Sequence, residues 1–136
     1  MVALGVYAKD THIPLKEIAA HVQVSDNYLE QLVALLRKAG YVKSIRGAQG
    51  GYRLAVDPKD ISVGQILRVL EGSLAPTECS CEENPSECNN HNHCVTRDVW
   101  IRIRDGINGV VDSITLAELV SDYEKENQKE AYMFHI

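Results

Sequence analysis

One short segment of the chain concentrates the residue types that bind soft metal ions. Residues 79–94 read CSCEENPSECNNHNHC and hold all four cysteines of the protein, together with two of its five histidines. Thiolates and imidazoles bind zinc, thiolates hold iron–sulfur clusters, and neighbouring thiols form disulfides. Four interpretations are open: a disulfide framework, a zinc site, an iron–sulfur site, and a solvated loop whose thiols bind no metal and only oxidise.

Compartment and spacing separate these interpretations. The first residues do not resemble a signal peptide, and no apolar stretch approaches the length of a membrane span, so we expect a cytoplasmic protein with no membrane partner. Cytosolic thiols stay reduced, which disfavours a disulfide framework. The spacing C-x-C, six residues, C, five residues, C lacks the paired knuckles of most zinc sites, although four thiolates would satisfy zinc. A long polar loop is able to wrap an iron–sulfur cluster.

The elements around this segment follow from periodicity and turn residues. Helical spacing predicts a first short helix over residues 15–22 and a second over residues 26–39, with Ser25 as the N-cap of the second. Two β-like pieces, YVKSI and YRLAV, flank the glycine-rich RGAQGG and predict a hairpin. A further amphipathic helix follows over residues 62–71. Thr115 and Glu118 form a capping box that opens the last helix.

After the cysteines, apolar residues recur at intervals of three and four. They predict a helix with a heptad-like seam that would pair with a second copy of the chain. The seam residues are Trp100, Ile103, Ile107, Val110 and Ile114. We therefore expect a homodimer. Gly106 and Gly109 lie within this helix and indicate either a close approach to a neighbour or a bend.

Charge is distributed unevenly along the chain. The net charge is −5, but residues 1–56 carry 7 Lys and Arg against 4 Asp and Glu, whereas residues 57–136 carry 7 against 15. The run from Arg37 to Arg53 has five basic residues and no acid. A basic patch on an acidic protein is typical of a nucleic-acid contact, and an unevenly charged solvated surface is the alternative.

Two helices followed by a hairpin describe a winged helix-turn-helix. The expected fold is mainly α with a small β-hairpin wing, continued by a long C-terminal dimerisation helix. We expect three parts: a DNA-binding domain over residues 1–72, a cysteine-rich sensor loop over 73–94, and the dimerisation helix with a last helix and tail over 95–136. The side chains expected to contact duplex DNA are Ser25, Asn27, Tyr28, Glu30, Gln31, Lys43, Arg46, Gln49 and Arg53.

Three stretches carry a more specific signal. YLEQLVALLRKAGYVKSIRGAQGGYRLA, ILRVLEG and CVTRDVWIRIRDGINGVVDSITLAEL resemble the Rrf2 family of bacterial winged-helix regulators over nearly the whole chain. The resemblance implies a dimeric, sequence-specific transcriptional regulator, a repressor, of cysteine and sulfur or iron–sulfur metabolism. By the same resemblance, Asn27, Glu30 and Arg46 occupy positions that contact DNA. Family members usually begin with about a dozen more residues, so it also implies that either Met1 is a misplaced start or the first helix is shortened.

The resemblance bears on the cysteines as well. Cluster-binding relatives carry three cysteines ahead of the long helix, and Cys81, Cys88 and Cys94 match their spacing. One branch adds a histidine at the position of Arg97, whose guanidinium cannot bind a metal. We favour Cys79 as the fourth ligand of an iron–sulfur cluster. His91, His93 and an exogenous ligand are the alternatives.

Other classes of function are weighed against this one. The closing EAYMFHI resembles the cysteine-metabolism branch, whose members are thought to work with a cysteine-synthesis enzyme, so a cluster-free regulator controlled by such a partner is one alternative. An iron–sulfur or zinc protein that does not bind DNA is another. An enzyme is not expected, because no base–nucleophile pair is recognisable and RGAQGG lies between strands instead of before a helix. Our hypothesis is that cluster loading or thiol oxidation reshapes the loop and shifts the two recognition helices.

Overall fold

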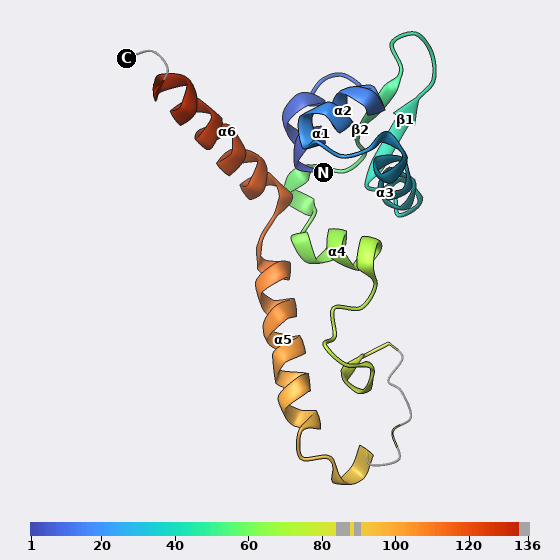
Figure 1. Ribbon diagram of the computed structural model, residues 1–136, viewed down its shortest axis with the longest axis vertical. Coiled ribbons are helices and arrows are strands. Elements are labelled where there is room, and N and C mark those ends of the chain that lie inside the picture. The colour runs from blue at the N-terminus through green and yellow to red at the C-terminus, as the bar shows by residue number, and fades with distance from the viewer. Residues whose placement is uncertain (84–87, 89–90, 134–136) are drawn as a thin grey trace.

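The computed structural model describes residues 1–83, 88 and 91–133, and its chain forms a helical domain with a small hairpin and two long C-terminal helices (Figure 1). The elements are, in order, α1 (Val2–Tyr7), α2 (Leu15–Val22), α3 (Asp26–Lys38), β1 (Val42–Ile45), β2 (Gly51–Leu54), the 3-10 turn η1 (Pro58–Asp60), α4 (Val63–Glu71), the 3-10 turns η2 (Glu78–Ser80) and η3 (His91–His93), α5 (Arg97–Ser113) and α6 (Leu116–Met133).

The helix-turn-helix forms where the sequence predicts it. Gln23 ends α2 in the left-handed conformation with φ 55°, and the Ser25 hydroxyl accepts a hydrogen bond of 3.3 Å from the backbone N–H of Tyr28. The cap satisfies one of the N–H groups that a helix start leaves without a partner. Leu29, Val33 and Leu36 then turn one face of α3 into the main core.

The hairpin is an antiparallel pair in which Val42 lies opposite Leu54 and Lys43 opposite Arg53. The chain before α2 pairs with β2 through a single antiparallel bridge, because Ile13 and Tyr52 exchange backbone hydrogen bonds of 3.0 and 2.9 Å. A side chain at Gly51 would meet the Ile13 backbone at 2.5 Å, so this close approach requires glycine. The wing is therefore attached to the helical domain at its base, and its turn projects away (Figure 1).

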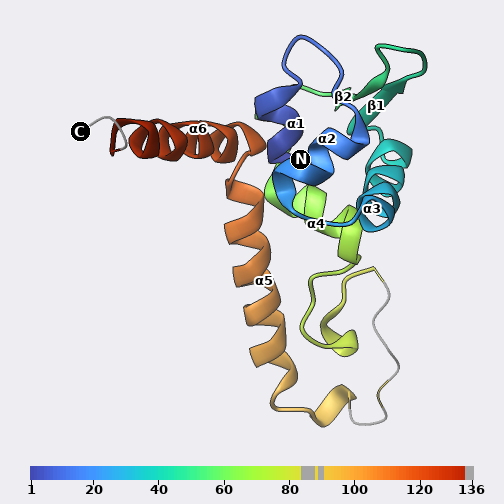
Figure 2. The same cartoon turned by 45° about the horizontal axis from the view of Figure 1, so that its top comes forward.

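The last two helices leave the domain in different directions (Figure 2). The backbone N–H of Val63 donates to the Ile114 carbonyl, at 2.9 Å, and that of Leu116 to the Ile61 carbonyl, at 2.8 Å; these bonds fix the junction of α5 and α6 against the start of α4. Ile61 and Leu116 are fully buried there, in a second small core. The predicted capping box is confirmed, since Glu118 accepts from the Thr115 N–H at 2.7 Å.

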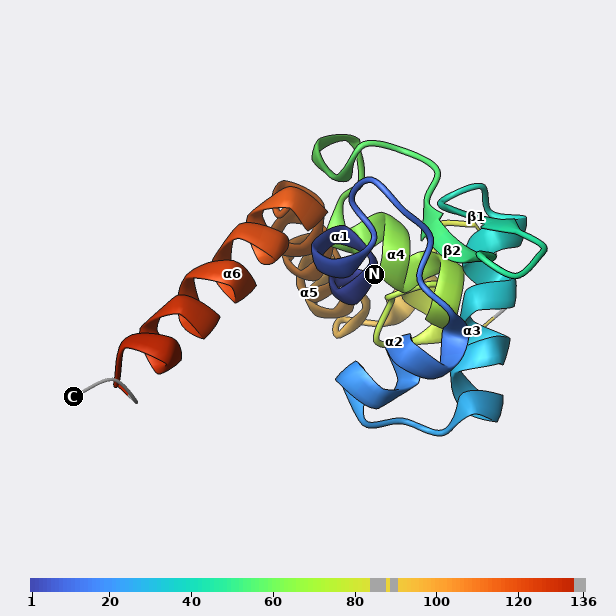
Figure 3. The same cartoon turned by 90° about the horizontal axis from the view of Figure 1, so that it is seen from above.

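Two features differ from the sequence-based expectation. The last helix runs on to Met133 and so takes in most of NQKEAYMFHI, residues 127–136, which the sequence indicates as a tail, because its Glu, Gln, Lys and Ala residues all favour helix. The loop between α4 and α5 contains two short 3-10 turns. Seen from above, α3 and the hairpin lie on the side of the domain opposite α6 (Figure 3).

Candidate nucleic-acid interface and cysteine-rich loop

The N-terminal half of α3 presents polar side chains to solvent. Leu29 is buried, whereas the five predicted contact residues around it are exposed: Ser25, Asn27, Tyr28, Glu30 and Gln31. Helical spacing thus separates an apolar face that packs in the core from a face that offers amide, carboxylate and hydroxyl groups. Amide and carboxylate groups of this kind pair with base edges in a major groove.

The wing divides the remaining predicted DNA contacts into two sets. Arg46 and Gln49 lie in the exposed turn between the strands. Lys43 and Arg53 face each other across the strands and line a pocket that the wing forms with α1 and α6. Because side chains alternate along a strand, they lie on the opposite face from Ser44, whose hydroxyl accepts from Arg37 of α3 at 3.4 Å. The structure therefore does not bring Lys43 and Arg53 together with the exposed face of α3.

The predicted dimer seam is an exposed apolar stripe on α5. Trp100, Ile103, Ile107 and Val110 are between 37% and 61% exposed, and no residue of α5 is buried. A Cβ added at Gly106 or Gly109 would meet no described atom within 4 Å. Ile114, the last predicted seam residue, lies just past the end of α5 and is half-buried beside α4. A contiguous apolar stripe of this kind is typical of a protein–protein contact.

No disulfide joins the four cysteines, all of which lie among the described residues, and three of them are half-buried. Cys79, Cys81 and Cys94 are partly covered, whereas Cys88 is exposed. Within the described ranges, no three His, Cys, Asp or Glu side chains lie together as metal ligands do. Thiolate donors are the type that an iron–sulfur cluster needs, but this arrangement does not gather them, so we derive no chemical step through a bound cluster.

The Cys94 thiol stands at the entrance to α5. Its sulfur lies 3.3 Å from the Thr96 hydroxyl, and this hydrogen bond, with a backbone contribution from Thr96 and smaller ones from Arg97, lowers the pKa of the Cys94 thiol. The thiolate is the nucleophilic and metal-binding form of cysteine. The lowered pKa therefore favours the thiolate form of Cys94.

Two arginines, neither of them a predicted site residue, connect the loop and the winged domain to α5. Arg104 of α5 donates a hydrogen bond of 2.7 Å to the carbonyl oxygen of Ser80, which lies between Cys79 and Cys81. Arg68 of α4 donates to both carboxylate oxygens of Asp112, at 2.7 and 2.8 Å, and to Asn108 at 2.9 Å. The sequence around a basic residue on an amphipathic helix does not indicate which distant group that residue will contact. Sequence analysis therefore missed both contacts.

The contact between Arg104 and the Ser80 carbonyl stabilises the loop because both residues are largely shielded from solvent. Ser80 is 1% exposed, and its hydroxyl donates to the Thr77 carbonyl at 2.8 Å. The Arg104 side chain is 14% exposed and also pairs with Asp105 and Glu82, at 2.7 and 3.3 Å. A buried carbonyl that lost this cationic donor would lose a charge-assisted hydrogen bond without compensation. The η2 turn is thus fastened to the helix that carries the predicted dimer seam.

Comparison with known proteins places the chain in a family. Residues 1–122 match the model of the Rrf2 family, described as "Iron-dependent Transcriptional regulator". The regulator CymR of Bacillus subtilis is 48% identical over 122 residues, which cover 90% of this chain and 80% of CymR. Its structure, described as that of the global cysteine regulator, matches with a TM-score of 0.67 at 43% identity over 88% of each chain.

IscR proteins are similar as well. The structure of T. potens IscR matches with a TM-score of 0.69 at 45% identity, over 92% of this chain and 79% of IscR. The IscR regulator of Photobacterium profundum is 37% identical over 122 residues, which cover 90% of this chain and 69% of that protein. No helix in the described part of the chain combines the length and apolar character that crossing a bilayer requires.

Proposed function

Because this chain belongs to the Rrf2 family of transcriptional regulators, we propose that it is a dimeric repressor that binds an operator through α3 and the wing turn. Its regulated genes serve cysteine metabolism, for which its CymR relative is described as the global regulator, or iron–sulfur metabolism, which the resemblance of its cysteine spacing to cluster-binding relatives suggests. The residues that contact base edges are Asn27, Glu30 and Gln31, with Ser25 and Tyr28 on phosphates and Arg46 and Gln49 in the adjacent minor groove.

One observation carries this proposal: the division of α3 into a buried and an exposed face at its N-terminal end. Leu29 is 8% exposed, whereas its neighbour Tyr28 is 53% exposed. A recognition helix needs this arrangement, because its core face holds it to the domain while the first two turns enter the major groove. The predicted contacts in the wing turn, Arg46 and Gln49, follow the C-terminal end of the same helix in the sequence.

The dimer follows from α5. Two recognition helices must be held about one helical turn of DNA apart to bind both halves of a palindrome. The stripe from Trp100 to Val110 supplies an apolar surface for a second α5, and the open space at Gly106 and Gly109 would let the two backbones approach closely. Arg68 then transmits the position of α5 to the winged domain, since it joins α4 to Asp112.

The cysteine-rich loop is the sensor in this proposal. A thiol change at Cys79 or Cys81 would disturb the Ser80 carbonyl between them, and Arg104 would carry that disturbance into α5. If an iron–sulfur cluster is the signal, Cys81, Cys88, Cys94 and Cys79 are the residues that would hold it. Reversible oxidation of the same thiols is the other form of the signal.

The test is operator binding as a function of thiol state. Duplexes selected from a random pool by the purified protein would give the operator, and affinities would then be compared at fixed salt for reduced, oxidised and anaerobically iron–sulfide-reconstituted protein. The proposal expects selection of a palindrome and at least a fivefold difference in affinity between two of the states, roughly 1 kcal/mol. If the selection enriches no sequence, the proposal that the protein binds an operator is wrong. If the affinities of the three states are equal, the loop is not the sensor.

A cysteine-synthesis enzyme is the protein partner that the resemblance of the tail suggests. Residues 134–136 of that tail lie outside the described residues. Capture of such an enzyme by the full chain, and loss of the capture when the last seven residues are deleted, would support this partner. If the enzyme is not captured at micromolar concentrations of both proteins, it is not a partner of this chain.

A further inference from the structure

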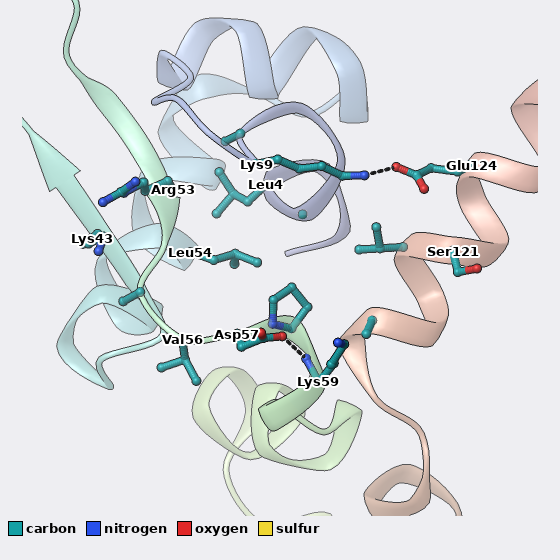
Figure 4. A pocket seen from close by; sticks show the side chains of 16 residues that line it. Leu4, Lys9, Lys43, Arg53, Leu54, Val56, Asp57, Lys59, Ser121 and Glu124 are labelled. Atoms are coloured by element: carbon teal, nitrogen blue, oxygen red, sulfur yellow. Dashed lines mark hydrogen bonds and ion pairs between the residues drawn. The ribbon is translucent and has the colours of Figure 1, made fainter.

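A pocket of about 500 Å³ lies between the wing, α1 and α6, and none of its lining residues belongs to α3 (Figure 4). Its floor is apolar, with Leu4 of α1, Leu54 of β2 and Val120 of α6 among its lining residues. A volume of this size is typical of sites for small organic molecules. Neither the helix-turn-helix nor the dimer seam needs such a pocket.

The charges around the pocket are not balanced. Lys9 is neutralised by Glu124 of α6 at 2.6 Å, and the Asp57 carboxylate accepts from the backbone N–H of Lys59 at 2.9 Å. Lys43, Arg53 and Lys59 also line the pocket, and no acidic partner lies within 4 Å of their charged groups in the part of the chain that the structure describes. The rim therefore keeps three unneutralised cations, two of which, Lys43 and Arg53, lie on the wing.

These two cations are held together by the sheet. Lys43 and Arg53 are directly opposed in the register of β1 and β2, a position in which like charges repel. In Figure 4 Lys43 and Arg53 lie on the neighbouring strands of the wing, whereas Lys9 reaches across to Glu124. The Nε atom of Arg53 is moreover buried without a hydrogen-bond acceptor among the described residues. A buried donor without an acceptor is costly, and an anion at this place would relieve both the repulsion and the missing bond.

Shape and charge favour a small molecule over a DNA backbone at this place. The opposite wall is α6, whose carboxylate at the pocket, Glu124, is already paired with Lys9. A pocket of about 500 Å³ that α6 closes on this side admits a single small anion more readily than a duplex, and such an anion can lie against the wing with its apolar part on the floor. A guanidinium beside an ammonium matches a carboxylate, which accepts two hydrogen bonds in parallel.

We propose that this pocket binds a small carboxylate with a short apolar chain, with its carboxylate on Arg53 and Lys43 and its chain against Leu4, Leu54 and Val120. The ligand would bridge the wing and α6. If the proposed function is correct, occupancy would also change the position of the wing relative to α6, the helix that follows the dimer seam. The binding itself does not depend on DNA, so the two proposals fail separately.

The test uses the full chain in the absence of DNA. Titration calorimetry would compare hexanoate with hexanamide, its uncharged analogue of the same shape. Binding of hexanoate, weakened about tenfold or more for hexanamide, is the expected result, because the amide offers no negative charge to the two cations. Equal affinity for the two molecules, or no hexanoate binding, would overturn the proposal without any variant.

Variants locate the site. R53Q and K43Q should each weaken hexanoate about tenfold or more, and S121F should block it by filling the pocket from α6. K38Q removes an equal charge from the exposed end of α3 and should leave the affinity unchanged. Far-UV circular dichroism would check that each variant is folded. If R53Q and K43Q bind hexanoate as the unmodified protein does, the carboxylate is not held there, and a weakened affinity of the same variants for DNA would identify the pair as phosphate contacts.

Discussion

Arg104 and Ser80 join the cysteine-rich loop to α5 across 24 residues of sequence, through a hydrogen bond of 2.7 Å from Nη1 to the carbonyl oxygen. Cys79 and Cys81 flank this carbonyl, so the turn that positions two thiols is held by the helix that exposes the apolar stripe. Arg68 makes the corresponding connection between α4 and Asp112. Both the loop and the winged domain are thus fastened to one helix.

Replacing Arg104 should loosen the η2 turn. R104A leaves the buried Ser80 carbonyl without its charged donor, a loss of about 1–3 kcal/mol in local stability. Because thiol labelling requires opening of the turn, the labelling rate of Cys79 and Cys81 by a thiol-reactive dye should rise at least about fivefold. R102A, an exposed arginine two residues away, is the matched control. Equal labelling rates in R104A and the unmodified protein would show that the contact does not hold the turn.

The Arg68–Asp112 pair predicts a dependence of stability on pH. The hydrogen bonds from Arg68 lower the pKa of Asp112 below its ordinary value, so the ionised carboxylate is favoured in the folded state. Its stabilising contribution is therefore present above the unfolded pKa of about 3.9 and is lost as the pH falls through the lower folded value. The partial exposure of both side chains, 34% and 45%, keeps this contribution small.

Urea unfolding of D112N and the unmodified protein measures this contribution. The difference in unfolding free energy should be constant between about pH 5 and pH 7 and should shrink below about pH 4. D60N removes an exposed carboxylate for which the described residues supply no ion-pair partner, and it should show no such trend. A difference that grows on acidification would contradict the assignment, because its sign would be wrong.

Arg46 tests the contribution of the wing turn to DNA binding. R46A should weaken binding to the selected operator by about 1–3 kcal/mol if its guanidinium enters the minor groove. Fluorescence anisotropy at one fixed salt concentration would measure the change, with K38A as a control that removes an exposed positive charge outside the proposed contacts. An R46A affinity equal to that of K38A would remove Arg46 from the interface.

Trp100 tests the seam. W100D places a carboxylate in the middle of an apolar stripe whose members would be buried in a dimer, and an unpaired buried charge is strongly destabilising. Sedimentation velocity should therefore show a monomer, or a dimer that forms only at much higher protein concentration. V95D introduces the same charge at a residue that is 89% exposed and precedes α5, and it should sediment as the unmodified protein does. A W100D dimer as stable as the V95D dimer would show that α5 pairs through another face.

Local features of this protein were predictable from its sequence because their causes are local. Ser25 caps α3, Thr115 and Glu118 open α6, and the glycine-rich turn joins two strands, each through residues within a few positions of one another. The heptad-like spacing on α5 likewise appears as an exposed stripe. The family resemblance, confirmed by the comparisons, extends these local signals to the winged-helix fold.

The tertiary structure decided which distant groups meet. Arg104 and Ser80 are 24 residues apart, Arg68 and Asp112 are 44, and the pocket draws its walls from α1, the wing and α6. It also separated Lys43 and Arg53 from the exposed face of α3, although all of them belong to one basic and polar stretch of sequence. The physical reason is that spacing fixes the face of an element on which a residue lies, whereas packing between elements fixes what that face contacts.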